Sequence, residues 1–263
     1  MVKKSRIREI ALNVYRDRGV YVLTLDVDWA SEDALKYCYN TLNEFDIPMT
    51  FFITHKSKFI SQLLKENKIE AGIHPNFAKG SSHGSTHDEV IEYCLKLLPK
   101  AEVFRCHRYY DVNDITDKFF KLGFKYDSNL CTLLENVPPF VHRSGLIRFP
   151  VFFEDGAYLY HNMNLNFKEV KEKHFAQPGI KVINLHPMHI ALNTPDFSYM
   201  RSIKDNLTRS EWNNLTEKQL EELSYNGCGI RTFVLELFEF IKKNNIETYT
   251  LKEIYQRINK ENI

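Results

Sequence analysis

The sequence lacks the features that would place it outside the ordinary globular proteins. Its 263 residues include no stretch of transmembrane length that is free of charged residues. The 35 Lys and Arg residues nearly balance the 34 Asp and Glu residues, leaving a formal net charge of +1, and no dense basic block alternates with aromatic residues. These absences predict a protein with no integral membrane segment and no nucleic-acid partner.

Two further absences bear on the cellular compartment. The basic N-terminus, residues 1–7, is followed by Arg8 and Glu9, which interrupt any apolar signal-peptide core. No C-x-x-C pair exists, so neither a disulfide framework nor a thiolate zinc site is indicated. The cysteines are odd in number and widely spaced: Cys38, Cys94, Cys106, Cys131 and Cys228. We therefore expect a protein of the reducing cytoplasm.

What the chain does contain is an alternation of short β-branched or aromatic runs with longer amphipathic stretches. Hydrophobic residues make up 43% of it, enough to bury a large core as one domain over residues 1–263. The predicted strands are 20–26, 49–54, 69–74, 102–105, 124–127, 145–153, 181–185 and 247–250. Helices are predicted after Ser31 and Thr86, and at 59–64, 115–122, 230–241 and 251–258.

This alternation predicts parallel βα units that close into a barrel or an open sheet. One long segment, residues 190–228, does not fit the alternation. Its polarity and aromatic content are mixed. A segment of that length inside a compact domain is either functional or contains helices that the pattern does not delimit.

Ionisable side chains gather where two of the predicted strands end. Asp26 and Asp28 end the first strand, and His74 ends the third. Parallel-sheet proteins place their active sites at this edge. Alternation along a strand would send both aspartates to the same side, where they repel each other unless one binds a cation or is protonated. The alternative is a solvated turn, in which Asp is common.

Either of two nearby histidines could join His74 at a metal. Neutral imidazoles plus one carboxylate are a common set of protein ligands for Zn²⁺ or a similar divalent ion. His83 lies in the polar loop 76–85 and is free to swing toward the strand ends. His87 stands at a predicted helix start, a normal place for a structural histidine. The pattern favours His83 and keeps His87 as the alternative.

Three more motifs could complete a site. Arg105, at the end of the fourth strand, would pair with a carboxylate at the sheet edge, or else form a surface ion pair. His186 follows the strand 181–185, where a histidine could act as a general acid at neutral pH or simply cap the strand. Glu154 and Asp155 form an acidic pair of a kind that is also common in turns.

Together these motifs resemble the polysaccharide deacetylase superfamily with the NodB homology fold, also called carbohydrate esterase family 4. The resemblance covers nearly the whole chain through residues 24–28, 72–74, 104–105, 185–187 and 248–254. A narrower similarity, to the branch typified by WbmS and associated with bacterial O-antigen clusters, lies in residues 72–77, 82–84, 105–107 and 153–155. The resemblance implies an α/β fold, a distorted (β/α) barrel of the NodB type.

The resemblance also implies a function. The protein would be a metal-dependent hydrolase that removes an N-acetyl or similar acyl group from a nucleotide- or lipid-linked amino sugar during bacterial surface polysaccharide biosynthesis. It could form a homo-oligomer. The expected metal is Zn²⁺, with Co²⁺, Fe²⁺, Ni²⁺ and Mn²⁺ as alternatives. The metal would activate a water and, with a backbone N–H of residues 106–109, hold the tetrahedral oxyanion.

Roles carry over by position. Asp26 would be the base, His186 the general acid and Arg105 the residue that orients Asp26. The expected metal ligands are Asp28, His74 and His83, with His87 as the alternative to His83. Residues expected to contact substrate or to support these groups are Trp29, Asn76, His107, Glu154 and Asp155.

The chain departs from the family pattern at three positions. Val27 separates two aspartates that are usually adjacent. Ala78 stands where the second histidine is expected, and His107 stands where the third motif has a proline. These departures leave the third ligand and the substrate open.

Two other functions fit part of the pattern. A phosphotransfer enzyme of the haloacid dehalogenase type would use Asp26 as nucleophile and Asp28 as acid/base, although Ala30 and Arg148 depart from that motif. A catalytically inactive carbohydrate-binding protein could keep the same fold. Aromatic residues that could stack on sugars are Tyr109, Tyr110, Tyr158 and Trp212.

Overall fold

A computed structural model of the chain describes residue 15 and residues 17–260. The basic segment 1–7, which the sequence argues is not a signal peptide, lies outside these residues. The strands are β1 (Gly19–Asp26), β2 (Met49–Ile53), β3 (Glu70–Ile73), β4 (Val103–Phe104), β5 (Tyr126–Asp127), β6 (Phe140–Val141), β7 (Ile147–Arg148), β8 (Val151–Glu154), β9 (Gly179–Leu185) and β10 (Glu247–Tyr249).

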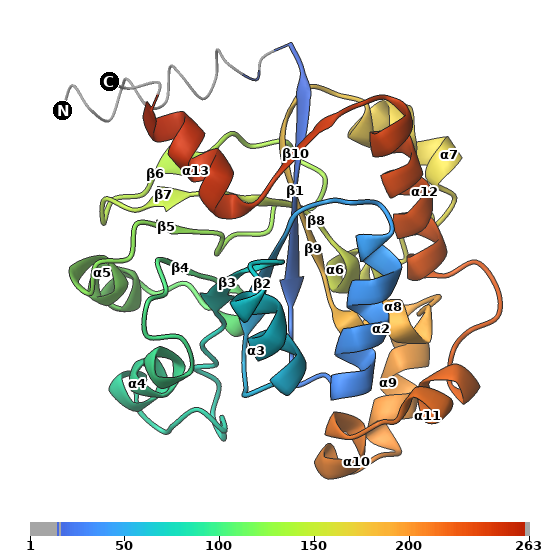
Figure 1. Ribbon diagram of the computed structural model, residues 1–263, viewed down its shortest axis with the longest axis horizontal. Helices are drawn as coiled ribbons and strands as arrows, with labels where there is room; N and C mark the ends of the chain where they lie inside the picture. The colour runs from blue at the N-terminus through green and yellow to red at the C-terminus, as the bar shows by residue number, and fades with distance from the viewer. Residues whose placement is uncertain (1–14, 16, 261–263) are drawn as a thin grey trace.

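Helices surround this sheet (Figure 1). The longer ones are α2 (Glu32–Asn43), α3 (Lys58–Lys65), α4 (His87–Leu97), α5 (Asn113–Lys121), α9 (Phe197–Asp205), α12 (Ile230–Lys243) and α13 (Leu251–Lys260). The shorter ones are α6 (Asp155–Tyr160), α7 (Phe167–Val170), α8 (Pro187–Leu192), α10 (Arg209–Asn213), α11 (Glu217–Glu222), the 3₁₀ turn η1 (His107–Tyr109) and the π turn η2 (Lys171–Phe175).

The strands form one ten-stranded sheet in the order β6-β7-β5-β4-β3-β2-β1-β9-β8, with β10 beside β1. Only β6 and β7 pair in antiparallel fashion among the described strands. The predicted strand 145–153 is divided into β7 and β8 by Phe149 and Pro150, because proline has no N–H to donate to a ladder.

That short connection closes the sheet. β7 lies near one end of the strand order and β8 at the other, yet only two residues join them. The sheet must therefore curl until its ends meet. There the Val151 N–H donates to the Leu130 carbonyl at 2.7 Å, and the Thr132 N–H donates to the Val151 carbonyl at 2.9 Å. The predicted distorted (β/α) barrel is confirmed.

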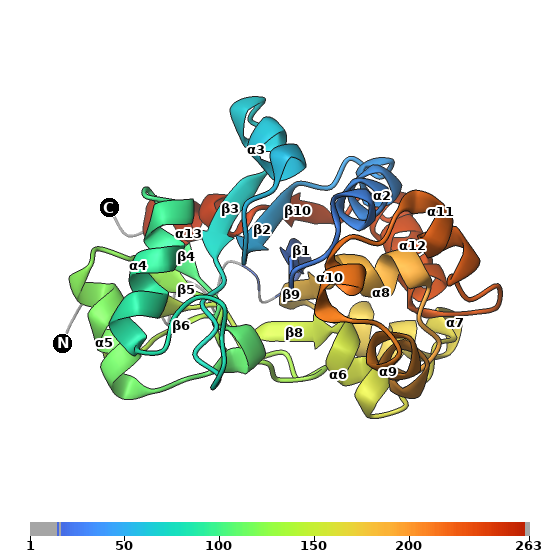
Figure 2. The ribbon, with the colours of Figure 1, turned by 90° about the horizontal axis from the view of Figure 1, so that it is seen from below.

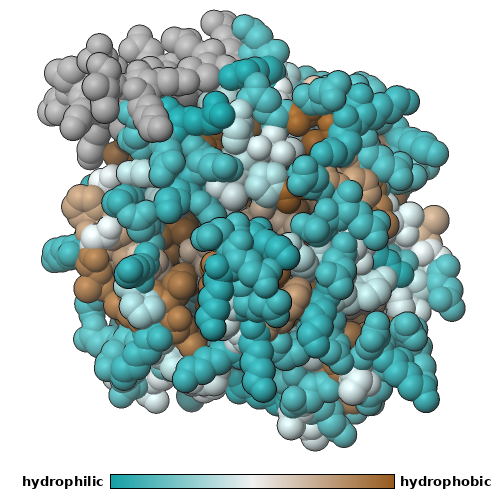
Figure 3. Space-filling view, viewed as in Figure 1, coloured by the Kyte–Doolittle hydropathy of each residue, from teal (hydrophilic) through white to brown (hydrophobic). Residues whose placement is uncertain are grey.

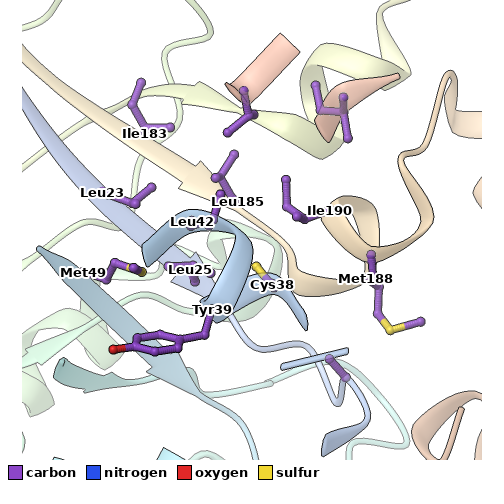
Figure 4. Packing of buried hydrophobic residues seen from close by; sticks show 14 of the residues in the cluster. Leu23, Leu25, Cys38, Tyr39, Leu42, Met49, Ile183, Leu185, Met188 and Ile190 are labelled. Carbon is purple, nitrogen blue, oxygen red and sulfur yellow. The ribbon is translucent and has the colours of Figure 1, made fainter. Parts of the chain in front are cut away.

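Alternate residues of the central strand β1 face two separate cores. Leu23 and Leu25 pack with α2 and with the end of β9, as Figure 4 shows. Val20 and Val22 instead join the core beneath α13. Because both faces are covered, seven of the eight β1 residues are buried, as expected for a parallel strand.

The segment 190–228 contains helices, which the sequence offered as one of two possibilities. After α8 come α9, α10 and α11, whose N-caps are Asp196, Thr208 and Thr216. Figure 2, seen from below Figure 1, places α10 beside the end of β1 and α9 next to α6. The segment therefore forms a wall beside the carboxyl ends of the strands.

The face shown in Figure 3 is mainly hydrophilic, with hydrophobic residues scattered among the polar ones. Of the helices in residues 17–260, none combines the length and apolar character that a membrane span requires.

The core generates a stability prediction. Leu42 of α2 is fully buried, and Leu42→Ala should lower the free energy of unfolding by about 2–5 kcal/mol, because the lost contacts leave a cavity. Leu122→Ala is the matched control: Leu122 is 53% exposed, so its loss should cost less than about 0.5 kcal/mol. Urea denaturation measures both, and equal losses would show that Leu42 does not pack as described.

Candidate functional site

A cavity of about 430 Å³ opens at the carboxyl ends of the strands. Six of the residues expected to act as catalytic groups, metal ligands or their supports line it, and they come from β1 and β8 or from the turns after β1, β3, β4 and β9. They are Asp26, Asp28, His74, His107, Glu154 and His186. The sheet edge thus gathers most of the expected site.

A strained turn after β1 positions Asp28. The strand ends at Asp26, and the next residues leave the pleat: Asp28 and Trp29 have φ values of 43° and 56°, in the left-handed region that non-glycine residues seldom adopt. The Trp29 N–H donates to Thr54 Oγ1 at 3.1 Å, which fixes the turn to the end of β2. Strand alternation, the expected cause, therefore does not extend to Asp28.

Asp26 is held by two donors in a buried network. Its Oδ1 accepts from Arg105 Nη1 at 2.9 Å, and its Oδ2 accepts from Asn184 Nδ2 at 2.9 Å. Burial alone would raise the pKa of Asp26, but Arg105, His74 and His186 hold it below its usual value. The carboxylate is therefore ionised at neutral pH and fixed in orientation.

Arg105 is itself fully buried and makes contacts that match the fork of its guanidinium. Besides Asp26, it donates to Thr24 Oγ1 and to the carbonyl and hydroxyl of Ser128. This geometry agrees with the expected carboxylate partner at the sheet edge. It does not agree with the alternative expectation, a surface ion pair.

Asp28, His74 and His107 form the group best suited to a metal. Asp28 Oδ1 lies 3.2 Å from His74 Nε2 and 3.0 Å from His107 Nδ1. His74 is 1% exposed, and neither of its ring nitrogens has a hydrogen-bond partner in the described part of the chain. Such orphaned buried nitrogens are costly, and a bound cation would give one of them a partner.

The electrostatics of Asp28 agree with this role. Burial would raise the pKa of Asp28, yet the neighbouring His107 and His74 hold it well below its usual value. One carboxylate with two imidazoles is a common ligand set for Zn²⁺ and similar ions.

The structure does not bring His83 to this group. His83 Nε2 lies 2.8 Å from the Thr54 carbonyl, and its Nδ1 accepts the Asn76 N–H at 3.1 Å. The ring stacks on Tyr93 with centroids 4.5 Å apart, and burial lowers the pKa of His83 to about 4. Both nitrogens are thus used to fasten the loop 76–85, and they leave no lone pair for a metal.

The other expected residues of this region also lie away from the cavity or at its margin. His87 packs against the rings of Phe77 and Tyr110. Asn76 supports His83 rather than the cavity. The Trp29 ring lies between His83 and His107, with centroids 5.3 Å and 5.4 Å away.

His186 is oriented by the acidic pair that ends β8. Its Nδ1 lies 2.5 Å from Asp155 Oδ1, its backbone N–H donates to Asp155 Oδ2 at 2.7 Å, and its Nε2 lies 3.6 Å from Asp28 Oδ2. Burial would lower the pKa of His186, but Asp155, Glu154 and Asp28 raise it well above its usual value. Burial also raises the pKa of Glu154, to about 7. The ring therefore presents a protonated Nε2 to the cavity.

A second group with metal-binding side chains lies beside the first, and consists of Asp155, His186 and His189. Two of its ring nitrogens are already engaged: His186 Nδ1 with Asp155 and His189 Nδ1 with Thr194 Oγ1 at 3.1 Å. These hydrogen bonds make the group a support that orients His186 rather than a metal site.

Sequence reasoning missed Asn184, which joins two parts of the site. Its Nδ2 donates a hydrogen bond to Asp26 Oδ2, and its Oδ1 accepts one from Arg105 Nη1 at 2.5 Å. Asn184 stands two residues before His186, and Thr24 two before Asp26. The period of two along each strand was the signal that could have found both.

The turn after β4 restricts the expected oxyanion donors. The N–H groups of Cys106, His107 and Tyr109 donate to Asn129 Oδ1, the Pro75 carbonyl and the Cys106 carbonyl. Within the described residues, only the Arg108 N–H of this stretch has no such partner.

Residues of the segment 190–228 complete the cavity wall, among them Phe197, Met200 and Trp212. Of the aromatic residues expected to stack on sugars, Tyr109 and Trp212 line the cavity. Tyr158 is fully buried in the core, and Tyr110 lies beside Phe77.

Comparisons with known proteins agree with the fold. The family model described as WbmS-like, polysaccharide deacetylase, matches residues 23–204. No curated protein matches the chain. A crystal structure of WbmS from Bordetella bronchiseptica, a protein proposed to be a polysaccharide deacetylase involved in O-antigen biosynthesis, is 22% identical, with a TM-score of 0.75 over 87% of this chain and 93% of that one.

Two other solved structures are more distant. The peptidoglycan deacetylase PdaC from Bacillus subtilis is 9% identical, with a TM-score of 0.46 over 95% of both chains. A family 4 acetyl xylan esterase from Clostridium thermocellum, in complex with cobalt, is 12% identical, with a TM-score of 0.41 over 90% of both chains.

The buried ion pair yields a prediction. Arg105→Met leaves Asp26 as an uncompensated buried charge and should lower the free energy of unfolding by about 3–5 kcal/mol. Arg143→Met, which removes a 52% exposed partner of Asp117, should cost less than about 1 kcal/mol. Adding Asp26→Asn to Arg105→Met should recover part of the loss. Chemical denaturation measures the free energy of unfolding of each variant. An Arg105→Met protein as stable as Arg143→Met would contradict the buried hydrogen-bond network around Asp26.

Proposed function

The chain belongs to the WbmS-like polysaccharide deacetylase family, and on that premise we propose that it is a metal-dependent hydrolase acting on an acylated amino sugar. It removes an N-acetyl or similar acyl group from a nucleotide- or lipid-linked precursor of a bacterial surface polysaccharide, such as O-antigen, in the cytoplasm. The observation that carries the proposal is the buried His74 ring, whose nitrogens have no hydrogen-bond partner in the described residues and which lies against Asp28.

The proposed metal ligands are Asp28, His74 and His107. His107 takes the place that the sequence gave to His83 or His87, because both nitrogens of His83 bond the backbone and His87 packs against Phe77. Zn²⁺ suits one carboxylate and two imidazoles, and Co²⁺, Fe²⁺, Ni²⁺ or Mn²⁺ accept the same set. Held by these three residues, such an ion would supply an activated water and polarise the acyl carbonyl.

Asp26 is the proposed base. Each of its oxygens accepts one fixed hydrogen bond, from Arg105 or from Asn184, and keeps a lone pair for the proton of an attacking water. The buried position prevents reorientation of the carboxylate. Arg105 therefore acts as a positioning residue that also keeps Asp26 ionised.

His186 is the proposed general acid. Asp155 holds Nδ1, so the proton on Nε2 points into the cavity, where the amine of the sugar departs. Amines leave poorly as anions, so this proton is needed for C–N cleavage. The Arg108 N–H is the backbone donor available to the oxyanion.

The two alternative functions, a phosphotransfer enzyme and an inactive carbohydrate-binding protein, are not equally supported. Membership of the deacetylase family leaves the haloacid dehalogenase interpretation without support. An inactive carbohydrate-binding protein of the same family would show metal binding with no acyl release in the experiments below.

Metal content tests the ligand set. Protein purified without chelator or nickel affinity resin should carry about one divalent ion per chain, and His74→Ala and His107→Ala should each lose it because a ligand is gone. Mass spectrometry of bound metal, with circular dichroism to verify folding, makes the measurement. His87→Ala is the matched control and should keep the ion. A folded His107→Ala protein with full occupancy, or a folded His83→Ala protein without metal, would contradict the assignment.

Turnover tests the acid. His186→Ala and Asp155→Asn should lower kcat for acetate release by about 10²–10⁴-fold with little change in KM, because the proton acts only as the bond breaks. His174→Ala, at the opposite end of β9, should behave like wild type. Acetate is assayed on a panel of N-acetylated sugars. Near-normal turnover in His186→Ala would remove His186 from the mechanism.

A further inference from the structure

Three basic side chains line the same cavity as the candidate metal centre, and the reaction proposed above uses none of them. Arg108 comes from the turn after β4, and Arg201 and Lys204 come from α9. Residues three apart lie on one face of a helix, so α9 presents both of its cations together. Two segments far apart in the sequence thus contribute positive charge to one space.

Most of this charge is not neutralised within the protein. Arg201 Nε pairs with Asp205 at 2.8 Å, and both side chains are more than half exposed. Within the described residues, Arg108 and Lys204 form no ion pair, and the Lys204 ammonium instead lies 5.2 Å from the centre of the Trp212 ring. At least two positive charges therefore face the cavity without a carboxylate partner.

The cations also oppose one another. Burial lowers the pKa of Lys204, the negative charges of Asp28 and Asp205 act to raise it, and the positive charges of Arg201 and Arg108 act to lower it, so that the pKa stays below its usual value. A cluster of like charges raises the electrostatic free energy of the folded chain, and an anion bound among them removes that cost.

The backbone at Arg108 is strained as well. Arg108 and Tyr109 have φ values of 57° and 52°, two consecutive non-glycine residues in the left-handed region. Each such residue costs free energy, because the left-handed region crowds the Cβ atom against the backbone. Arg148 holds the turn in place by bonding Asp111 beyond it and Asp127 at the end of β5. The strain is therefore imposed by the surrounding structure, and it places Arg108 beside the candidate ligand His107.

The same cavity also has apolar lining residues, among them Tyr160, Met188, Phe197 and Met200, and its carboxylates are Asp26, Asp28 and Glu154. A neutral polysaccharide would leave the cations unpaired, whereas the two negative charges of a diphosphate match the two unneutralised cations. We propose that Arg108, Lys204 and Arg201 form a diphosphate subsite, so that the substrate is an amino sugar joined to its carrier through a diphosphate. This inference rests on the proposed function, because it sets the anion beside the deacetylating centre.

Binding measured apart from turnover tests the subsite. Isothermal titration calorimetry on the full chain would use three probes: inorganic pyrophosphate, uridine diphosphate and farnesyl diphosphate. Arg108→Gln and Lys204→Gln should each weaken diphosphate binding about tenfold, because each removes one charge-assisted contact. Lys243→Gln, an exposed cation at the far end of α12, is the matched control and should bind within about twofold of wild type.

Protein treated with a chelator should keep this affinity, which separates binding by the side chains from binding by a metal. Tighter binding of uridine diphosphate than of farnesyl diphosphate would identify a nucleotide carrier, and the reverse a lipid carrier. Equal affinities for all three probes would show that the diphosphate alone is recognised. Absence of diphosphate binding in wild type, or equal binding by wild type, Arg108→Gln and Lys204→Gln, would overturn the subsite.

Activity provides an independent reading. With a deacetylating protein, Lys204→Gln should lower kcat/KM only for a diphosphate-linked N-acetyl sugar and leave that for free N-acetylglucosamine unchanged. A wild type that binds diphosphates through Arg108 and Lys204 but releases no acetate would refute the proposed function and not the subsite. Acetate release without dependence on either cation would refute the subsite alone.

Discussion

One buried guanidinium holds the carboxyl ends of the central strands together. Arg105 follows β4, and its donors reach Asp26 on β1, Asn184 on β9 and Ser128 beyond β5. Its plane also lies over the Phe52 ring of β2, 4.3 Å from the centroid. Removing a charge from water is costly, and a buried pair is tolerated when every remaining donor is satisfied. Each nitrogen of the Arg105 guanidinium donates to at least one acceptor, so the carboxylate of Asp26 stays ionised and immobile in the interior.

Closure of the barrel has a similar consequence for the general acid. The two-residue connection through Phe149 and Pro150 carries the chain from one end of the sheet to the other, where β8 pairs with β9. Asp155, directly after β8, then meets His186, directly after β9. The Asp155–His186 contact therefore depends on the curl of the whole sheet. The geometry of the acid is a product of topology rather than of a local motif.

The strands and the residues at their ends could be predicted from the sequence because both follow short-range rules. Buried runs identify β1, β2, β3 and β9, and a strand end fixes where the next side chain lies. Asp26, His74 and His186 line the cavity for this reason, and Arg105 donates a hydrogen bond to Asp26. Resemblance to a family supplied their proposed roles, which the patterns alone did not.

The remaining features depend on contacts that no local pattern encodes. His83 is in a loop, and only the folded chain reveals that the Thr54 carbonyl and the Asn76 N–H use both of its nitrogens. The placement of His107 requires the left-handed turn at Arg108 and Tyr109, whose residue types do not favour it. The helices of the segment 190–228 have five to nine residues, too few for a periodic signal to stand out.

Several local costs of this fold lie around one cavity, although other non-glycine residues with positive φ, such as Leu133 and Leu134, lie outside its lining. Two pairs of non-glycine residues in left-handed conformation, at 28–29 and 108–109, border it. So do the orphaned nitrogens of His74 and the like charges of Arg108 and Lys204. Elsewhere α2 and α4 are capped by Ser31 and Thr86, and β9 is buried, as their sequences predict. Unfavourable local conformations and charges are found at sites where a ligand offsets their cost. Here the unpartnered nitrogens of His74 and the like charges of Arg108 and Lys204 call for ligands of opposite charge. A cation relieves the cost at His74 and an anion the cost at Arg108, so a ligand with an anionic group and an acyl amide would be aligned between them.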